Sequence, residues 1–268
     1  MTRADGAVAA TPLDRAHAAM EAAPEDARAR LTFYDRLAEA ELHLLLAAEA
    51  QGDALSPAVW PLETGPAVLA FDREDRLADF VEAPSPYAAL SGRALAQMLA
   101  GQGLTLALNL GAPSAILLPG PAVDWLAGAL RAEPPQMTRD RPQGLTPPGE
   151  VPEMLLAALD AKLAAAQGLA DGAYLAGALW PDGTRGHLLV FVDARPGAEP
   201  ALARAVGEAL TFSGLDAASL DVTFVAVSDP VAARLARVAV RIDLPRPVAS
   251  APAPAAPGSD PDRPPRLR

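Results

Sequence analysis

Hydrophobic and polar residues alternate most sharply in the segment from Leu104 to Pro119. Leucine occupies every second position from 104 to 110, smaller or polar residues fill the positions between, and a Gly-Ala-Pro-Ser sequence follows. Side chains on a strand point alternately to its two faces, so this spacing predicts a strand with these leucines on one face. The run SAILLP predicts a partner strand. The segment therefore indicates a sheet that packs on a hydrophobic core.

The first half of the chain also contains clear helix signals. Thr11, followed by Pro12 and by Asp14 three positions on, predicts an N-cap and a helix that runs to about Ala22. A loop containing Trp60 is expected between two strand-like runs. The other elements that we expect here are a helix opened by Pro24, strands over residues 42–49 and 66–72, and helices over residues 91–100 and 122–131.

The second half predicts one helix followed mainly by strands. Leu155, Leu159 and Leu163 form an i, i+4 stripe after Pro152, and Gly168 stands where a left-handed helix cap is typical. The other expected elements are a hairpin over 173–193 around a Pro-Asp-Gly-Thr turn, a helix over 200–213, a strand with Leu220, Val222 and Phe224 inward, a helix over 230–237, and a strand with Val238, Val240, Ile242 and Leu244 inward.

Proline-rich segments divide the chain. We expect residues 132–151 to be a proline-rich linker, because proline lacks a backbone N–H and disfavours helix in the residue before it. Residues 245–268 contain many prolines and few large apolar side chains, which predicts a disordered tail. The expected fold class is α+β, with two small domains over residues 1–131 and 152–244. Each would have a mixed or antiparallel sheet with packed helices.

Composition narrows the possible classes of function. The chain has 268 residues, 51% of them hydrophobic, which is enough for two domains of roughly 100 to 200 residues each. Its formal charge of -11 disfavours nucleic acid or an anionic membrane as a partner. The absence of cysteine excludes disulfides, thiolate nucleophiles and zinc-thiolate sites. Without a leader-like start or a membrane-spanning apolar run, a cytoplasmic protein is expected.

The histidines give no metal-binding pattern. His43 lies in a leucine run and His187 begins a strand, so both are interpreted as ordinary strand residues. His17 is expected on the solvated side of the first helix. Because no His-Glu-x-x-His or similar spacing is present, we expect no metal and no cofactor.

Two charged features are candidates for chemistry. The run from Asp72 to Arg76 offers paired carboxylates for acid-base catalysis or for magnesium. Its alternating signs favour a solvated, self-paired surface instead. Lys162 is the only lysine, and its place between the apolar stripe positions of a helix favours a solvated amine over a reactive one.

Three uncharged residues complete the candidate interaction sites, together with Asp72. Trp60 and Trp180 each precede a proline at a loop or hairpin edge, where an aromatic ring either contacts a partner or packs in the core. Asn109 faces away from the leucines and precedes a turn. Its amide either bonds the backbone of residues 111–114, which is the favoured interpretation, or binds a ligand.

Several motifs in each half of the chain are characteristic. The first half contains TPLDRAH, LHLLLAAE, AVLAFD, the helix start from Ser91 to Leu95, and LALNLGAPSAILLP. The second half contains PEMLLAAL, AYLAGALW and VRIDLPRP. In these motifs the first half resembles the SseB N-terminal domain, and the second half is similar to the SseB C-terminal domain. The family name refers to enhanced serine sensitivity. The resemblance implies a cytoplasmic bacterial protein and supplies no active-site residues.

We therefore expect a non-enzymatic binding or regulatory protein whose partner is another protein or a small metabolite. One alternative is an enzyme whose site brings together dispersed residues such as Glu63, Asp72 and His43, because active sites assemble from distant segments. A second alternative is a secretion-associated protein. A deep pocket in which these side chains converge would favour the enzyme.

Overall fold

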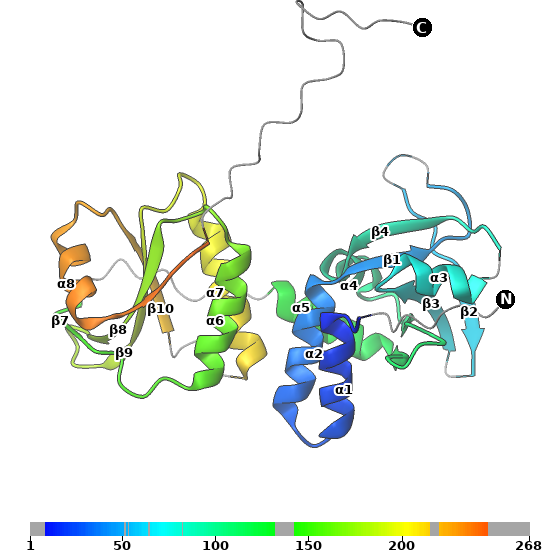
Figure 1. Ribbon diagram of the computed structural model, residues 1–268, viewed down its shortest axis with the longest axis horizontal. Coiled ribbons are helices and arrows are strands. Elements are labelled where there is room, and N and C mark those ends of the chain that lie inside the picture. The colour runs from blue at the N-terminus through cyan, green and yellow to red at the C-terminus, as the bar shows by residue number, and fades with distance from the viewer. Residues whose placement is uncertain are drawn as a thin grey trace, which may run out of the picture.

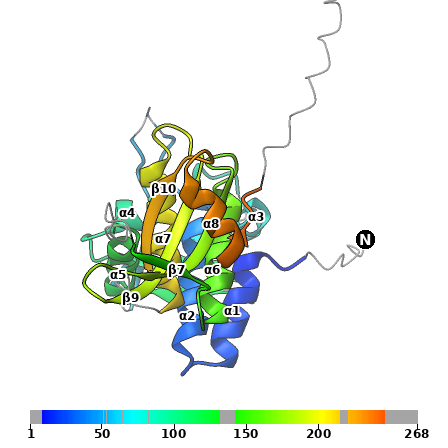
Figure 2. The ribbon, with the colours of Figure 1, turned by 90° about the vertical axis from the view of Figure 1, so that its left-hand side faces the viewer.

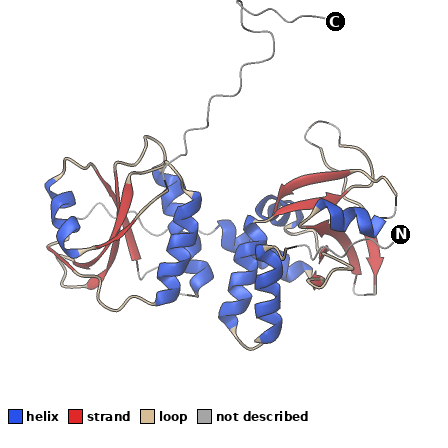
Figure 3. Cartoon of the chain, in the orientation of Figure 1, coloured by secondary structure: helices blue, strands red, loops and turns tan. Residues whose placement is uncertain are grey.

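The computed structural model describes residues 9–245, except for residues 51, 53, 64, 82, 132–141 and 215–219. The fold is α+β, with two units that each contain a mixed β-sheet packed with helices (Figure 1). This confirms the fold class expected from the sequence. Helices fill the space between the two sheets, as the colouring by secondary structure shows (Figure 3).

The first unit contains five helices and six strands among the residues described. Its helices are α1 (Pro12–Ala22), α2 (Ala27–Glu39), α3 (Glu74–Val81), α4 (Gly92–Leu99) and α5 (Gly120–Arg131). Its strands are β1 (Glu41–Leu45), β2 (Val59–Leu62), β3 (Gly65–Phe71), β4 (Tyr87–Ser91), β5 (Thr105–Leu108) and β6 (Ile116–Leu118). The strand order is β4-β1-β3-β5-β6, and β2 also pairs with β3. β3 and β5 are parallel, whereas the other pairs are antiparallel.

The second unit is built around a long hairpin. Its helices are α6 (Glu153–Ala165), α7 (Glu199–Ser213) and α8 (Pro230–Val238). Its strands are β7 (Gly144–Thr146), β8 (Gly172–Leu179), β9 (Arg185–Val192), β10 (Leu220–Val225) and β11 (Val240–Ile242). The order is β10-β9-β8-β11, and β7 also pairs with β8. Only β9 and β10 are parallel among these pairs. The predicted hairpin over 173–193 is confirmed.

Side-chain caps explain where several helices begin. The Thr11 side chain accepts a hydrogen bond from the Asp14 backbone N–H, and the Asp14 carboxylate accepts one from the Thr11 backbone N–H, which completes the predicted capping box of α1. Ser91 caps α4 as predicted. The second helix begins after an Asp26 cap rather than at Pro24, because the aspartate side chain satisfies the free N–H of Arg28.

Each face of the first sheet has its own hydrophobic core. Leu106 of β5 packs with α1, α2, α4 and α5 in a core that includes Phe33 and Leu95. On the opposite face, Phe71 of β3 packs with Leu77 of α3. Burial on both faces explains why β5 contains apolar side chains at successive positions.

The second sheet is also covered on both faces. The predicted leucine stripe of α6, including Leu159, packs with α7 against Leu189 and Val222. Leu235 of α8 packs on the other face with Val190. In the view turned by 90°, α8 lies in front of the sheet and α6 and α7 lie behind it (Figure 2).

The two units meet through helices. α2 and α5 contact α7, and Figure 1 shows these helices side by side between the sheets. Phe212 of α7 is buried in the core of the first unit, with its ring centroid 6.4 Å from that of Trp125 in α5. At the end of α7, Gly214 has a left-handed φ of 72° and lies beside Leu31 of α2. The junction therefore contains a buried hydrophobic contact.

The leucine strand differs from its prediction in one respect. β5 pairs with β6 as predicted, and Leu106 and Leu108 share a core. Leu110, however, packs with the α3 side of the sheet. Asn109 has a φ of 51°, and this left-handed residue ends the two-residue alternation. The prediction that the leucines from 104 to 110 share one face is therefore wrong at Leu110.

Several strands were not predicted from the sequence. Trp60 lies in β2 rather than in a loop, and β4 was not predicted as a strand. Both strands are short: β4 lies at one edge of the sheet, and β2 pairs with β3 outside the main strand order. Pro61 in β2 also weakens the strand signal. The final strand begins later than predicted, because Val238 belongs to α8 and Val240 is 47% exposed at the sheet edge.

The proline-rich segments lie partly outside the described residues. Of the predicted linker 132–151, residues 132–141 are not described, and Gly144–Thr146 forms β7, which pairs with β8. An extended proline-flanked segment can satisfy a sheet edge even where it cannot form a helix. The predicted tail 245–268 lies outside the described residues except for Pro245.

Candidate functional site

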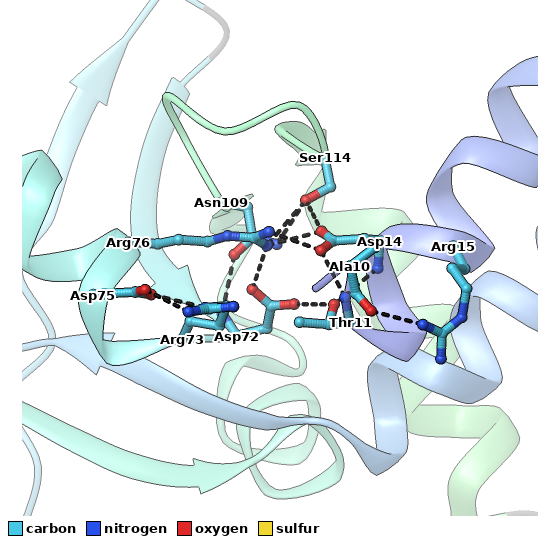
Figure 4. Close-up of polar contacts among 10 residues, drawn as sticks. All are labelled: Ala10, Thr11, Asp14, Arg15, Asp72, Arg73, Asp75, Arg76, Asn109 and Ser114. Atoms are coloured by element: carbon cyan, nitrogen blue, oxygen red, sulfur yellow. Dashed lines mark hydrogen bonds and ion pairs between the residues drawn. The ribbon is translucent and has the colours of Figure 1, made fainter. Parts of the chain in front are cut away.

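Polar side chains from three segments far apart in the sequence meet beside the first sheet. They come from the first turn of α1, from the end of β3 and the start of α3, and from the turn between β5 and β6. We call this set the Arg76 cluster: Thr11, Asp14, Asp72, Arg76, Asn109 and Ser114 (Figure 4).

The guanidinium of Arg76 lies between two aspartates. Its Nη1 donates to Asp14 Oδ1 at 2.8 Å and to Asp72 Oδ1 at 2.7 Å, and its Nη2 donates to Asp14 Oδ2 at 2.7 Å. The Asp72 side chain is only 3% exposed and that of Arg76 is 18% exposed. Charge-assisted bonds shielded from water are stronger than surface pairs. Arg76 therefore ties α1 to α3.

Asn109 and the two hydroxyl groups complete the cluster. The fully buried Asn109 accepts a hydrogen bond from the Asp72 backbone N–H at 2.9 Å and donates to Ser114 Oγ at 3.1 Å. Ser114 Oγ donates to Asp14 at 2.5 Å, and Thr11 Oγ1 donates to Asp72 at 2.6 Å. The partner of the Asn109 amide is thus the Ser114 side chain, not the turn backbone that the sequence favoured. Asn109 holds the turn against β3.

The surroundings of Asp14 favour its charged form. The hydrogen bond from Arg76 lowers the pKa of Asp14 well below its usual value, and bonds from Ser114 and from the Thr11 backbone act in the same direction. Burial opposes this shift but is outweighed. Asp14 is therefore charged at neutral pH and acts as an ion-pair partner of Arg76 rather than as a proton donor.

A pocket of about 330 Å³ lies beside the cluster, between α3 and the turn after β5. It is lined by Arg76, Asp79, Phe80, Leu110, Gly111 and Ala112. Arg76 is the member of the cluster that reaches this pocket, and its Nη atoms already contact carboxylates. The pocket therefore presents an arginine whose charge is largely compensated.

The run from Asp72 to Arg76 separates into two parts. Arg73 and Asp75 pair with each other at 2.5 Å on the surface, where Asp75 is 53% exposed, as the sequence predicts. Asp72 and Arg76 instead turn inward to the Arg76 cluster, so the prediction of a solvated surface is wrong for these two. Their partner Asp14 is 62 residues from Arg76, which the local pattern does not show.

The two candidate tryptophans lie in different units. Trp60 is 44% exposed on β2, and its ring meets Phe80 edge-on at 6.3 Å. The sequence favours core packing for Trp60. Its contact with Phe80 fits that role, whereas its exposure does not. Trp180 flanks the β8–β9 turn, where its backbone N–H donates to Thr184 O at 2.9 Å, and its side chain packs against the core beneath α8. Trp180 therefore packs as expected.

The other residues named for the enzyme alternative have separate surroundings. Glu63 is exposed in the turn between β2 and β3. His43 is a strand residue, as predicted, with Nδ1 3.3 Å from Phe71 O and its ring beside Tyr87. His187 is likewise in a strand and contacts Pro148 O at 2.8 Å. His17 is buried against Phe33, so its predicted solvation is wrong.

A second charged cluster lies at the junction of the two units. We call it the Lys162 cluster: Asp35, Glu39, Arg93, Lys162 and Glu208. Lys162 Nζ of α6 lies 2.5 Å from Asp35 and 2.7 Å from Glu39, both in α2, and 3.4 Å from Glu208 in α7. Arg93 of α4 forms two 2.8 Å hydrogen bonds with the Glu208 carboxylate. These charges connect the units.

The Lys162 side chain is only 5% exposed, so the prediction of a solvated lysine is wrong. Burial acts to lower the pKa of Lys162, but the Asp35 and Glu39 carboxylates outweigh it and the net shift is upward. Burial also acts to raise the pKa of Glu208, and the bonds from Arg93 outweigh it in the opposite direction. Lys162 is therefore a charged structural residue, because the α2 carboxylates cover it.

Sequence reasoning missed Asp14 and Ser114 in one cluster and Asp35, Glu39, Arg93 and Glu208 in the other. Asp14 was recognised as part of a cap, and that cap is present. A second role for a capping residue leaves no extra pattern in the sequence. The single lysine on an apolar helix was the available sequence signal for the junction, because a lysine that is buried is almost always paired with acids.

Two further observations limit the kind of site. Among the described residues, no group of three or more histidine, aspartate or glutamate side chains is arranged to hold a metal ion. Over the same residues, the helices are too short or too polar to cross a lipid bilayer.

These observations define a class: an α+β protein of two mixed-sheet units joined through helices, with its buried charges used in structural ion pairs. Comparison with known families is more specific. Residues 13–125 match the model of the SseB protein N-terminal domain. The chain therefore carries an SseB N-terminal domain, and this part of the resemblance is confirmed. Neither the curated proteins nor the solved structures gave a match.

Proposed function

We propose that this chain is a non-enzymatic, cytoplasmic binding or regulatory protein of the SseB family. In this proposal the second unit is an SseB C-terminal domain, and the domains extend over residues 1–131 and 152–244. The partner is a protein or a small metabolite, and the link to serine tolerance follows from the family name. The SseB match over residues 13–125 supports the first half of the proposal.

One observation supports this proposal most directly: the polar groups that could act in catalysis are bonded to one another within the Arg76 cluster. Asp72 and Asn109 were the polar candidates, and both have partners that hold α1, α3 and the β5–β6 turn together. A catalytic acid or base needs a free position toward a substrate. Here the carboxylates face Arg76, so they support the shape of the surface rather than a reaction.

The surface that we propose for the partner includes Trp60. This ring is 44% exposed, its neighbour Val59 is 53% exposed, and both lie on the short strand β2. Exposed tryptophan is enriched at the centres of protein interfaces, because it buries a large area with few rotatable bonds. Phe80 supports the Trp60 ring from behind.

Affinity purification from the native cytosol, followed by mass spectrometry of proteins and metabolites, tests this function. We expect specific species to co-elute with the wild-type chain and to decrease at least tenfold with Trp60→Ala, as for an interface hot spot. Leu117→Ala is the matched control, since Leu117 is also 44% exposed but lies on β6. The proposal fails if only background species co-elute while the purified protein converts a metabolite.

A further inference from the structure

A hollow of about 350 Å³ opens between α2 and α5, away from β2 and Trp60. It is lined by Ala27, Arg30, Leu31, Tyr34, Ala122 and Trp125. Trp125 is 43% exposed although it lies next to the junction of the units. The proposed function uses none of these residues.

Aromatic contacts hold the walls of this hollow in place. The ring centroids of Tyr34 and Trp125 are 5.0 Å apart, with the planes tilted by 56°. Trp125 also meets Phe212 edge-on, and Tyr34 meets Phe33 edge-on. Rings braced from behind lose little conformational entropy when a ligand binds. The hollow is therefore preorganised for an apolar ligand.

The hollow also contains hydrogen-bond donors that are available to a ligand. Within the part of the chain that the structure describes, the Tyr34 hydroxyl, the Trp125 indole N–H and the Arg30 guanidinium have no hydrogen-bond or ion-pair partner. Burial raises the pKa of Tyr34, so its hydroxyl keeps its proton. A fitting ligand would present apolar rings together with hydrogen-bond acceptors.

A proline-rich segment has this chemistry. In the polyproline II conformation the pyrrolidine rings pack against aromatic walls, and the backbone carbonyls stay free to accept hydrogen bonds. Proline has no backbone N–H that would need an acceptor in the hollow. We propose that residues 246–268 of this same chain bind in the hollow through their proline-rich part, around residues 252–257.

The sequence and the position of Pro245 support this occupant. Seven of the 23 residues after Pro245 are prolines. Pro245 lies near the hollow, because the Gly168 N–H donates to Pro245 O at 3.3 Å and Gly168 is six residues from Lys162. Lys162 in turn contacts Asp35, the neighbour in sequence of Tyr34. Six residues span at most about 20 Å. Twenty-three residues in polyproline II span about 70 Å, so the segment reaches the hollow easily.

The indole signals of the tryptophans test this binding in the full-length chain. We would record ¹⁵N spectra of the wild type and of a variant with Pro252→Gly, Pro254→Gly and Pro257→Gly, and assign Trp125 with Trp125→Phe. The Trp125 signal is expected to move in the triple variant, whereas those of Trp60 and Trp180 stay in place. An unchanged Trp125 signal would overturn the proposal.

A synthetic peptide of residues 246–268 provides the second measurement. Added to the triple variant, it should return the Trp125 signal to its wild-type position in a saturable way. Tyr34→Phe removes only one hydroxyl and should weaken peptide binding about fivefold to tenfold, as expected for one hydrogen bond. Leu117→Ala is the control and should leave the affinity unchanged, because Leu117 is as exposed as Trp125 but lies on β6 and does not line the hollow.

Two other outcomes would contradict the proposal. If Tyr34→Phe and Trp125→Phe, each combined with the triple variant, bind the peptide as tightly as the triple variant alone, the segment binds elsewhere. A wild-type Trp125 signal that moves toward the triple-variant position on tenfold dilution would show that the segment comes from a second copy. Neither outcome bears on the Trp60 surface, so this inference and the proposed function fail independently.

Discussion

Asn109 has three structural roles, one through its backbone and two through its side chain. It ends the alternation of β5 through its left-handed φ of 51°, it accepts the Asp72 backbone N–H, and it donates to Ser114. The first role was within reach of the sequence, because asparagine tolerates the left-handed conformation and a Gly-Ala-Pro-Ser turn begins two residues later. The other roles depend on Asp72, which is 37 residues away, and no local pattern encodes that distance.

Asp14 provides the pH test at this scale. Asp14→Asn should lower the free energy of unfolding at pH 7 by about 1.5 to 3 kcal/mol, because charge-assisted hydrogen bonds to Arg76 are lost. Its folded pKa is lowered, so its contribution is complete above the unfolded value of about 3.8 and is lost as the pH falls toward the folded value. The difference between wild type and variant should therefore shrink below about pH 4.

Urea unfolding between pH 3 and pH 7 measures this effect. Asp79→Asn is the control, since Asp79 is exposed at the edge of the neighbouring pocket and should change stability by less than about 0.5 kcal/mol. A wild-type advantage that stays equally large at pH 3 would contradict the assignment of this effect to the Asp14 carboxylate.

At the scale of elements, local signals predicted helices better than edge strands. The caps at Thr11 and Ser91 and the stripe of α6 are encoded within a few residues, and all three helices are present. β2 and β7 were missed because their strand character comes from pairing with β3 and β8, not from their own alternation. Propensity within a short segment does not reveal such a partner.

The contact of α4 with α2 gives a prediction for a single methyl group. A Cβ at Gly92 would lie 1.8 Å from the Leu37 carbonyl oxygen, so Gly92→Ala must move one helix. We expect a loss of about 3 kcal/mol or more, at the upper end of overpacking costs. Gly128→Ala in α5 is the control, because open space surrounds that position and alanine should stabilise the helix by about 0.5 to 1 kcal/mol.

Thermal and urea unfolding of the two alanine variants would show opposite shifts. A Gly92→Ala protein as stable as the wild type would mean that α4 does not approach α2 as closely as described.

At the scale of the whole molecule, the junction could not be predicted from the sequence. Lys162 was expected in water because a helix considered alone presents its polar residues to solvent. The structure places α2 and α7 over it, and three carboxylates surround its amine. The fold class and most elements of each unit follow from local patterns, whereas the association of the units depends on pairs such as Arg93 with Glu208 that are 115 residues apart.

Lys162→Met tests the strength of this junction. Removing the cation leaves Asp35 and Glu208 buried with less compensation, which should cost about 3 to 5 kcal/mol. We expect one cooperative unfolding transition in the wild type and two in the variant, measured by calorimetry. Arg73→Met is the control, because the Arg73–Asp75 pair lies at the surface and its loss should leave the unfolding transition nearly unchanged. A single, unshifted transition in Lys162→Met would contradict the role of this residue.

Phe212 belongs to the second unit by chain position and to the first by packing. Cleaving the chain between α5 and β7 would remove the Phe212 ring from the hydrophobic core of the first unit and leave that ring exposed on the second. Halves produced separately should therefore aggregate or recombine, and evolution could not exchange either half freely without supplying a substitute for that ring.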